Sequence, residues 1–187
     1  KTKRKENMKS LVLAAGYGTR LYPLTLDRPK PLVKVGGQTI LERILKKLEG
    51  IKTCDEVYVV TNGKFHKMLS SWMKGKSFAF KIEVINDETT SNEDRLGAIG
   101  DINLVLSEEK PKDDVLIVAG DNLFEFDIAD FASASHKKGK VGVALYDVKD
   151  TKLAQKYGIV SLGKDGMIVD FQEKPQGDGD GTAWING

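Results

Sequence analysis

The chain has 187 residues, of which 40% are hydrophobic and 30% charged, a composition typical of a globular protein that buries a core. It excludes disorder, a collagen-like repeat and a membrane span. The net charge of +2 comes from 29 basic and 27 acidic residues, and segment 1–7 alone holds four basic residues and one acidic residue. The remainder is nearly neutral, which removes the electrostatic argument for a nucleic acid or an anionic membrane as partner.

The ends and the single cysteine lead to three expectations. Residues 1–7 are expected to be a disordered basic tail or the remnant of a tag, and residues 8–187 one domain. Cys54 has no second cysteine with which to form an internal disulfide, and no apolar signal segment follows the basic start. We therefore expect a cytoplasmic protein.

Apolar runs separated by turn residues predict strands and helices in alternation. The first strand covers residues 9–15 and ends at Gly16, and residues 16–35 contain three prolines that exclude a helix. Thr39 and Glu42 form a capping box at the start of a helix that Gly50 ends. The further predicted strands are 56–61, 81–85, 114–119 and 141–146, and the further predicted helices are 65–73, 98–106 and 128–138.

The C-terminal part has a different pattern. Two short strands, 158–162 and 167–172, flank a Gly-Lys-Asp-Gly turn, which predicts a hairpin. Strands that alternate with helices and are followed by a hairpin predict an α/β fold, with a mostly parallel mixed sheet flanked by helices.

A glycine-rich turn follows the first strand, where an open α/β sheet places its ligand. A dinucleotide-binding fingerprint would need glycine in place of Leu21 and a helix in place of Pro23, and the residues of a P-loop are absent. What remains is a turn of small residues with Arg20 and, ten residues later, Lys30 between two prolines. Cations beside exposed backbone N–H groups suit a polyphosphate, although each feature alone is also common in ordinary surface loops.

Taken together, residues 13–25 (LAAGYGTRLYPLT) and 29–32 (PKPL) closely resemble the signature of the sugar-phosphate nucleotidylyltransferases. This family includes glucose-1-phosphate thymidylyl- and uridylyltransferases and mannose-1-phosphate guanylyltransferases. The resemblance extends over residues 8–187 and implies a Rossmann-like nucleotide-diphospho-sugar transferase fold. It also implies transfer of a nucleoside monophosphate from a nucleoside triphosphate to a sugar 1-phosphate.

The resemblance assigns roles to individual residues. Residues 95–100 (RLGAIG) are similar to a family segment that borders the base, although the usual threonine is missing. The nucleotide-binding residues implied are Ala14, Ala15, Gly16, Gly18, Thr19, Arg20, Lys30, Leu96 and Gly97. Asp121, in a Gly-Asp-Asn turn, corresponds to the aspartate that binds Mg²⁺ in the family, but in isolation it would be interpreted as a turn or cap residue. Arg20, Lys30 and Asp121 are thus the implied catalytic residues.

The sugar phosphate would be bound by the later segments. Residues 157–160 (YGIV), 173–175 (EKP) and 184–187 (WING) resemble family segments that line the sugar. The implied sugar-phosphate-binding residues are Gly158, Glu173, Lys174 and Asn186. No general base is needed because a phosphate monoester, with a second pKa near ~6, is ionised at neutral pH. His66 and His136 are accordingly expected to be surface or packing residues.

The chain departs from the family pattern at its C-terminal end. Family members carry a second metal-binding aspartate further along, so we expect the chain to be a fragment, or else a related domain without turnover. A thymidylyl or uridylyl donor with glucose 1-phosphate is the expected substrate pair, but residues 176–179 and 184–187 also resemble cytidylyltransferases. A non-catalytic regulatory domain is the alternative function, and a homo-oligomer is compatible with the resemblance.

Overall fold

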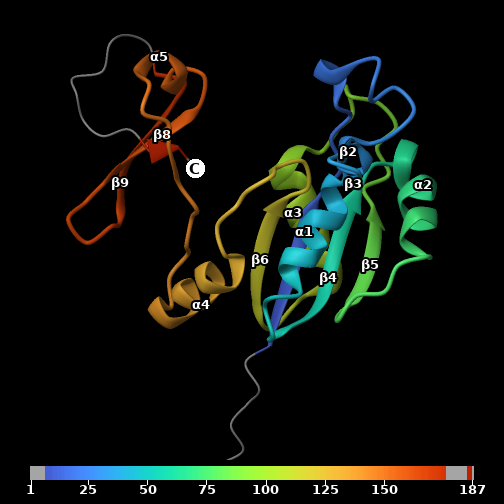
Figure 1. Ribbon diagram of the computed structural model, residues 1–187, viewed down its shortest axis with the longest axis horizontal. Helices are drawn as coiled ribbons and strands as arrows, with labels where there is room; N and C mark the ends of the chain where they lie inside the picture. Colours follow the sequence, from blue (N-terminus) through green and yellow to red (C-terminus); the bar gives the residue numbers. More distant parts are fainter. Residues whose placement is uncertain (1–6, 176–184, 187) are drawn as a thin grey trace, which may run out of the picture. The chain divides into compact units, whose positions relative to one another are not determined.

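A computed structural model of the chain describes residues 7–175 and the backbone of residues 185–186 (Figure 1). The chain divides into two compact units, residues 1–137 and residues 138–187. The predicted basic tail lies outside the described residues except for Asn7, whose side-chain amide donates to Asp55 Oδ2 over 2.8 Å. The single domain expected for residues 8–187 stays a prediction.

Four parallel strands form the sheet of the first unit, in the order β5-β4-β1-β6 (Figure 1). The strands are β1 (Met8–Leu13), β4 (Cys54–Thr61), β5 (Lys81–Asn86) and β6 (Asp114–Ala119). Each neighbouring pair runs parallel, which confirms the prediction of an α/β fold with a parallel sheet. Helices cover both faces of this sheet, so strand residues on both faces are buried.

The helices of this unit are α1 (Ile40–Leu48), α2 (Gly63–Met73), α3 (Gly97–Glu109) and α4 (Ile128–Lys138). Residues of α1, α2 and α4 pack in one core with Val12, Val57 and Val59, whereas α3 packs with Tyr58 and Val60 in a second core. Side chains alternate along a strand, so the two cores lie on opposite faces of the sheet. None of the described helices is both long and apolar enough to cross a membrane.

The predicted capping box begins α1 as expected, since the Thr39 hydroxyl accepts a hydrogen bond from the Glu42 N–H over 3.2 Å. The proline-marked segment before it contains no α-helix. It contains two 3₁₀ turns, η1 (Thr19–Leu21) and η2 (Lys30–Leu32), and it leads into a small hairpin of β2 (Lys34–Val35) and β3 (Gln38–Thr39).

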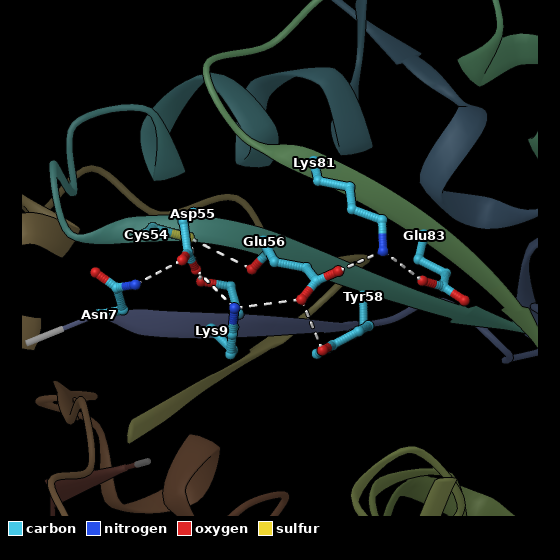
Figure 2. Close-up of polar contacts among 9 residues, drawn as sticks. Asn7, Lys9, Cys54, Asp55, Glu56, Tyr58, Lys81 and Glu83 are labelled. Atoms are coloured by element: carbon cyan, nitrogen blue, oxygen red, sulfur yellow. Dashed lines mark hydrogen bonds and ion pairs between the residues drawn. The ribbon is translucent and has the colours of Figure 1, made fainter. Parts of the chain in front are cut away.

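The sheet face under α3 becomes charged toward the amino ends of the strands (Figure 2). Glu56 lies at the centre, where its carboxylate contacts Lys81 Nζ at 2.7 Å and Lys9 Nζ at 3.3 Å. Tyr58 donates its hydroxyl to Glu56 Oε2 over 2.9 Å, and Glu83 contacts Lys81 at 3.1 Å. These charged side chains occupy the part of the sheet face beyond the apolar residues that pack with α3.

The second unit is antiparallel. Its sheet has the order β7-β10-β8-β9, with β7 (Tyr146–Asp147), β8 (Gly158–Leu162), β9 (Ile168–Glu173) and β10 (Ile185–Asn186), and a short helix α5 (Thr151–Ala154) lies between β7 and β8. The predicted hairpin is confirmed by the pairing of β8 with β9. The antiparallel strands therefore form a sheet of their own.

The strand predicted over residues 141–146 is wrong for residues 141–145, which are not in a strand. Only Tyr146 and Asp147 pair, and their partner β10 has two residues. A strand requires a neighbour along its length, and Val141, which is 94% exposed, has none within the described part of this unit. The alternating apolar residues of this segment therefore do not form a longer strand.

Candidate functional site

The carboxyl ends of the four parallel strands meet at one edge of the first unit's sheet, and the candidate site lies at this edge. The glycine-rich loop of residues 14–20 follows β1, and Asn62 follows β4. Asp87 follows β5, and Gly120 and Asp121 follow β6. Parallel pairing thus brings together residues more than one hundred positions apart.

The glycine-rich loop is closed by a hydrogen bond between two residues of the segment after β1. Gly18 has φ +64°, a conformation that favours glycine, and its carbonyl accepts from the Thr25 hydroxyl over 2.7 Å. A Cβ on Gly18 would lie 3.2 Å from the buried Thr25 side chain. This turn places Thr19 and Arg20 on η1, where both side chains are exposed. The Arg20 guanidinium makes no ion pair with any residue that the structure describes, and so it is free to bind an anion.

Two side chains from neighbouring strand ends anchor the start of this loop. The buried Asn62 donates its side-chain amide to the Ala15 carbonyl over 2.7 Å, while its Oδ1 accepts from the Phe65 N–H and caps α2. The Tyr17 hydroxyl lies 3.0 Å from Thr89 Oγ1. Ala14, Ala15 and Tyr17 are buried and Gly16 is exposed, so the loop reaches the surface at Gly16 while the Tyr17 side chain stays in the core.

Lys30 and Asp121 form an ion pair at this edge, with 2.7 Å between Nζ and Oδ2. The Gly-Asp-Asn turn is held against the end of β1, because the Gly120 N–H donates to the Leu13 carbonyl over 2.7 Å. A Cβ at Gly120 would lie only 2.6 Å from that oxygen, so the close approach requires glycine. Two residues assigned from the sequence, Lys30 and Asp121, are thus in direct contact.

Asp121 is the described residue best placed to bind a divalent cation. The described residues contain no group of three or more histidine, cysteine, aspartate or glutamate side chains that could hold a metal. One carboxylate, 42% exposed, fits Mg²⁺, which commonly uses one or two protein carboxylates and completes its shell with phosphate oxygens and water. It does not fit a metal that requires a cage of protein ligands.

Leu96 and Gly97 lie at the start of α3, in the segment that follows β5. Leu96 is 45% exposed, and Gly97 has φ +73°, so the chain turns there in a way that favours glycine. The segment is joined to the glycine-rich loop by the contact between Thr89 and Tyr17. Both residues are therefore on the same edge as the loop.

The residues assigned to the sugar phosphate gather in the second unit. Gly158 pairs with Glu173 across β8 and β9, and the Lys174 N–H donates to the Tyr157 carbonyl over 3.0 Å. A Cβ at Gly158 would lie 3.0 Å from Glu173 Oε2, and Lys174 Nζ is 3.5 Å from Glu173 Oε1. Asn186 lies on β10 opposite Ile159, whereas Trp184 and Gly187 lie outside the described residues.

The sequence did not point to Asn62, Asp87 or Thr89, which support the glycine-rich loop. The available signal was position: Asn62 and Asp87 directly follow buried parallel strands, just as Gly120 does. The rule that ligands bind beyond the carboxyl ends of such strands applies equally to all four strands.

A parallel sheet with a glycine-rich loop, an exposed arginine and a lysine–carboxylate pair at its carboxyl edge is typical of α/β proteins that bind nucleotides. The chain belongs to the nucleotidyl transferase family, whose model matches residues 9–184. The resemblance stated from the sequence is thereby confirmed.

Curated relatives cover most of this chain. It is 29% identical to the bifunctional protein GlmU of Methanococcus vannielii over 171 residues, which are 91% of the chain and 36% of that protein. It is 27% identical to a UTP–glucose-1-phosphate uridylyltransferase of Synechocystis over 173 residues, or 90% of the chain and 44% of that protein. The chain therefore spans less than half of the length of these relatives.

A solved structure shows the same fold. It is the crystal structure of a candidate glucose-1-phosphate thymidylyltransferase from Bacillus anthracis in complex with sucrose, with a TM-score of 0.77 and 23% identity. The match covers 96% of this chain and 68% of that one. The Rossmann-like α/β fold expected from the sequence is confirmed.

Proposed function

We propose that the chain provides the nucleotide-binding edge and part of the sugar-phosphate site of a sugar-1-phosphate nucleotidylyltransferase. In this reaction a sugar phosphate oxygen attacks the α-phosphorus of a nucleoside triphosphate. The new P–O bond forms as the bond to the β-phosphate oxygen breaks, and pyrophosphate leaves with that electron pair. The contact of Lys30 with Asp121 supports this proposal, because it brings one cation and one carboxylate together at the same edge of the sheet as the glycine-rich loop.

The described side chains suit a reaction between anions. Arg20, exposed and unpaired in the described part of the chain, would bind the β- and γ-phosphates and the departing pyrophosphate through its planar fork of donors. Lys30 would move from Asp121 to the α-phosphate. Lys174 would hold the sugar phosphate. These residues orient the reactants and offset their charge, and this type of catalysis needs no covalent intermediate.

Asp121 would hold Mg²⁺ at this edge of the sheet. When bound, the ion would supply positive charge that Lys30 and Arg20 alone do not. Neither histidine is placed to act as a base: His66 Nε2 lies 3.5 Å from Ser70 on its own helix, and His136 contacts Asp114 at 2.6 Å. The sugar phosphate needs none, since it is ionised at neutral pH.

Glucose 1-phosphate with UTP is the first substrate pair to test, because the uridylyltransferase relative from Synechocystis is named for it. The name of the candidate thymidylyltransferase from Bacillus anthracis makes the thymidine nucleotide the second choice for the panel. Since the chain spans part of its relatives, the assay should include both the 187-residue chain and the longest open reading frame that contains it.

The test is pyrophosphate release over a panel of nucleoside triphosphates and sugar 1-phosphates, with and without Mg²⁺. We expect release with one preferred pair and loss of release in Lys30→Met and Lys174→Met. Lys164→Met is the matched control, because Lys164 lies on the exposed turn between β8 and β9. Release by neither protein with any pair would overturn the proposal and favour a non-catalytic domain.

A further inference from the structure

Two buried carboxyl groups lie together at the nucleotide edge of the sheet. Asp87 directly follows β5, and Asp101 lies on the second turn of α3; the two residues are only 7% and 6% exposed. As ionised carboxylates, Asp87 Oδ2 and Asp101 Oδ1 have no hydrogen-bond partner in the described part of the chain. Burial without a partner is unfavourable for a charged group, so this pair requires an explanation.

One proton shared by the two groups resolves this conflict. Burial, the negative charge of Asp87 and a hydrogen bond between the two carboxyl groups together raise the pKa of Asp101 to about 6. Burial also raises the pKa of Asp87, but two hydrogen bonds from Thr89 and the one from Asp101 oppose the effect. The proton therefore lies on Asp101. The other charge that acts on the pair is Asp94, which is also acidic.

A chain of hydroxyl groups connects this pair with the glycine-rich loop. The Thr89 hydroxyl and the Thr89 N–H both donate to Asp87 Oδ1, each over 2.8 Å. A hydroxyl has one proton, so the Tyr17 hydroxyl must donate to Thr89 Oγ1 over their 3.0 Å contact. Tyr17 is 4% exposed and lies between Gly16 and Gly18. Hydrogen bonds through Thr89 and Tyr17 thus link Asp87 to the loop.

We propose that Asp87 and Asp101 hold one proton between them and act as positioning residues that fix the glycine-rich loop through Thr89 and Tyr17. The order of the loop is consequently linked to pH, because loss of the proton leaves two buried negative charges side by side. The expected effect on nucleotide binding rests on the proposed function, but the expected effect of pH on the order of the loop does not.

The test compares the wild-type chain with Asp101→Asn, whose amide donates to Asp87 without needing a proton. Hydrogen exchange is measured on amides of residues 14–20 as protection factors, which correct for the intrinsic effect of pH. We expect wild-type protection to fall by up to about tenfold between pH 5 and pH 7.5, because the loss grows tenfold per pH unit only until the pH passes the pKa of about 6. In Asp101→Asn, the amides of residues 14–20 should be equally protected at both pH values.

Two tyrosine variants test the connection. Tyr17→Phe removes the hydroxyl that reaches Thr89, so its loop should be poorly protected and insensitive to pH. Tyr58→Phe is the matched control, since Tyr58 is equally buried and donates its hydroxyl to Glu56 at the other end of the sheet. It should lower overall stability while its loop keeps the wild-type response to pH.

Several outcomes would overturn the inference. One is a loop in Asp101→Asn that responds to pH as the wild type does. Another is protection at pH 7.5 that added Mg²⁺ or Ca²⁺ restores in the wild type only, because the pair would then hold a cation. If Asp101→Asn does not fold, Asp87→Asn replaces it, since its amide can accept from Thr89 and donate to Asp101.

The enzymatic consequence is measured separately. In the wild type, the KM for the nucleoside triphosphate should rise as the pH increases through about 6, with little change in kcat, and in Asp101→Asn it should not. If no substrate pair is turned over, the proposed function fails. The exchange experiment still decides on the carboxyl pair, so the two failures are distinguishable.

Discussion

Lys30 and Asp121 are 91 positions apart in the chain, and their side chains meet with 2.7 Å between Nζ and Oδ2. The contact joins the loop after β1 to the turn after β6. Both side chains are partly exposed, so water and ligands have access to the pair. The two groups compensate each other's charge in this contact.

Asp121→Asn should separate function from stability. An exposed ion pair contributes at most about 1 kcal/mol, so the free energy of unfolding in urea should change by no more than that. Under the proposed function, pyrophosphate release should fall at least about 100-fold, because the carboxylate would hold the metal ion that offsets the phosphate charge. Lys76→Met breaks a comparable pair, 3.1 Å from Glu42, and should leave release unchanged. Full activity in Asp121→Asn would remove this residue from the site.

Arg20→Ala tests the exposed arginine of the glycine-rich loop. The guanidinium has no ion-pair partner among the described residues, so the circular dichroism spectrum and the melting temperature should match those of the wild type. Turnover should decrease about 100- to 1,000-fold, the usual loss when one group that stabilises developing charge is removed. Unchanged turnover in a folded variant would contradict the role assigned to Arg20.

Gly120→Ala tests the close approach between the ends of β1 and β6. The added Cβ would lie 2.6 Å from the Leu13 carbonyl oxygen, and backbone must move to relieve this contact. We expect a decrease of about 2 kcal/mol or more in the free energy of unfolding, together with a loss of activity because Asp121 moves. Gly75→Ala, which meets nothing within 4 Å, is the control and should be neutral.

Glu56 should make stability depend on pH. Hydrogen bonds from Lys81, Tyr58 and Lys9 hold the pKa of Glu56 below its ordinary value of 4.5 although burial opposes them. A lowered pKa means that this stability is complete above about pH 4.5 and is lost as the pH falls through the folded-state pKa.

Glu56→Gln should therefore lower the free energy of unfolding at pH 7 by about 1–2 kcal/mol. Its difference from the wild type should shrink in acid. The measurement is urea unfolding from pH 3 to pH 7. Glu83→Gln, which removes a more exposed partner of Lys81, should have a smaller effect. A constant difference at all pH values would show that Glu56 acts by packing and not by charge.

Asn62→Asp separates the helix cap from the anchor of the loop. The carboxylate can still accept from the Phe65 N–H, but it cannot donate to the Ala15 carbonyl and would repel it. We expect a decrease of about 2 kcal/mol in stability at pH 7. The deficit should narrow at low pH, where the introduced carboxyl group is protonated and can donate again. Wild-type stability at pH 7 would show that the anchor is unimportant.

Local patterns in the sequence predicted most of the secondary structure. Apolar runs gave the observed bounds of β6, β8 and α4, and Thr39 with Glu42 placed the start of α1. Periodicity failed over residues 141–145, because pairing there depends on a partner strand far along the chain. The candidate site was accessible through a motif, since Gly18, Arg20 and Lys30 lie close together in the sequence.

The supporting contacts depend on the pairing of distant strands. Asn62 reaches Ala15, and Thr89 reaches Tyr17, because parallel pairing aligns the carboxyl ends of β1, β4 and β5. The same alignment buries Asp87 beside Asp101 and turns two ordinary acidic residues into a pair that binds one proton. The groups expected to bind phosphate can be identified in the sequence, because they lie on a few residues that are close together in the chain. The contacts that hold those groups in place cannot be identified in the sequence, because the residues that make them come close only when the chain folds.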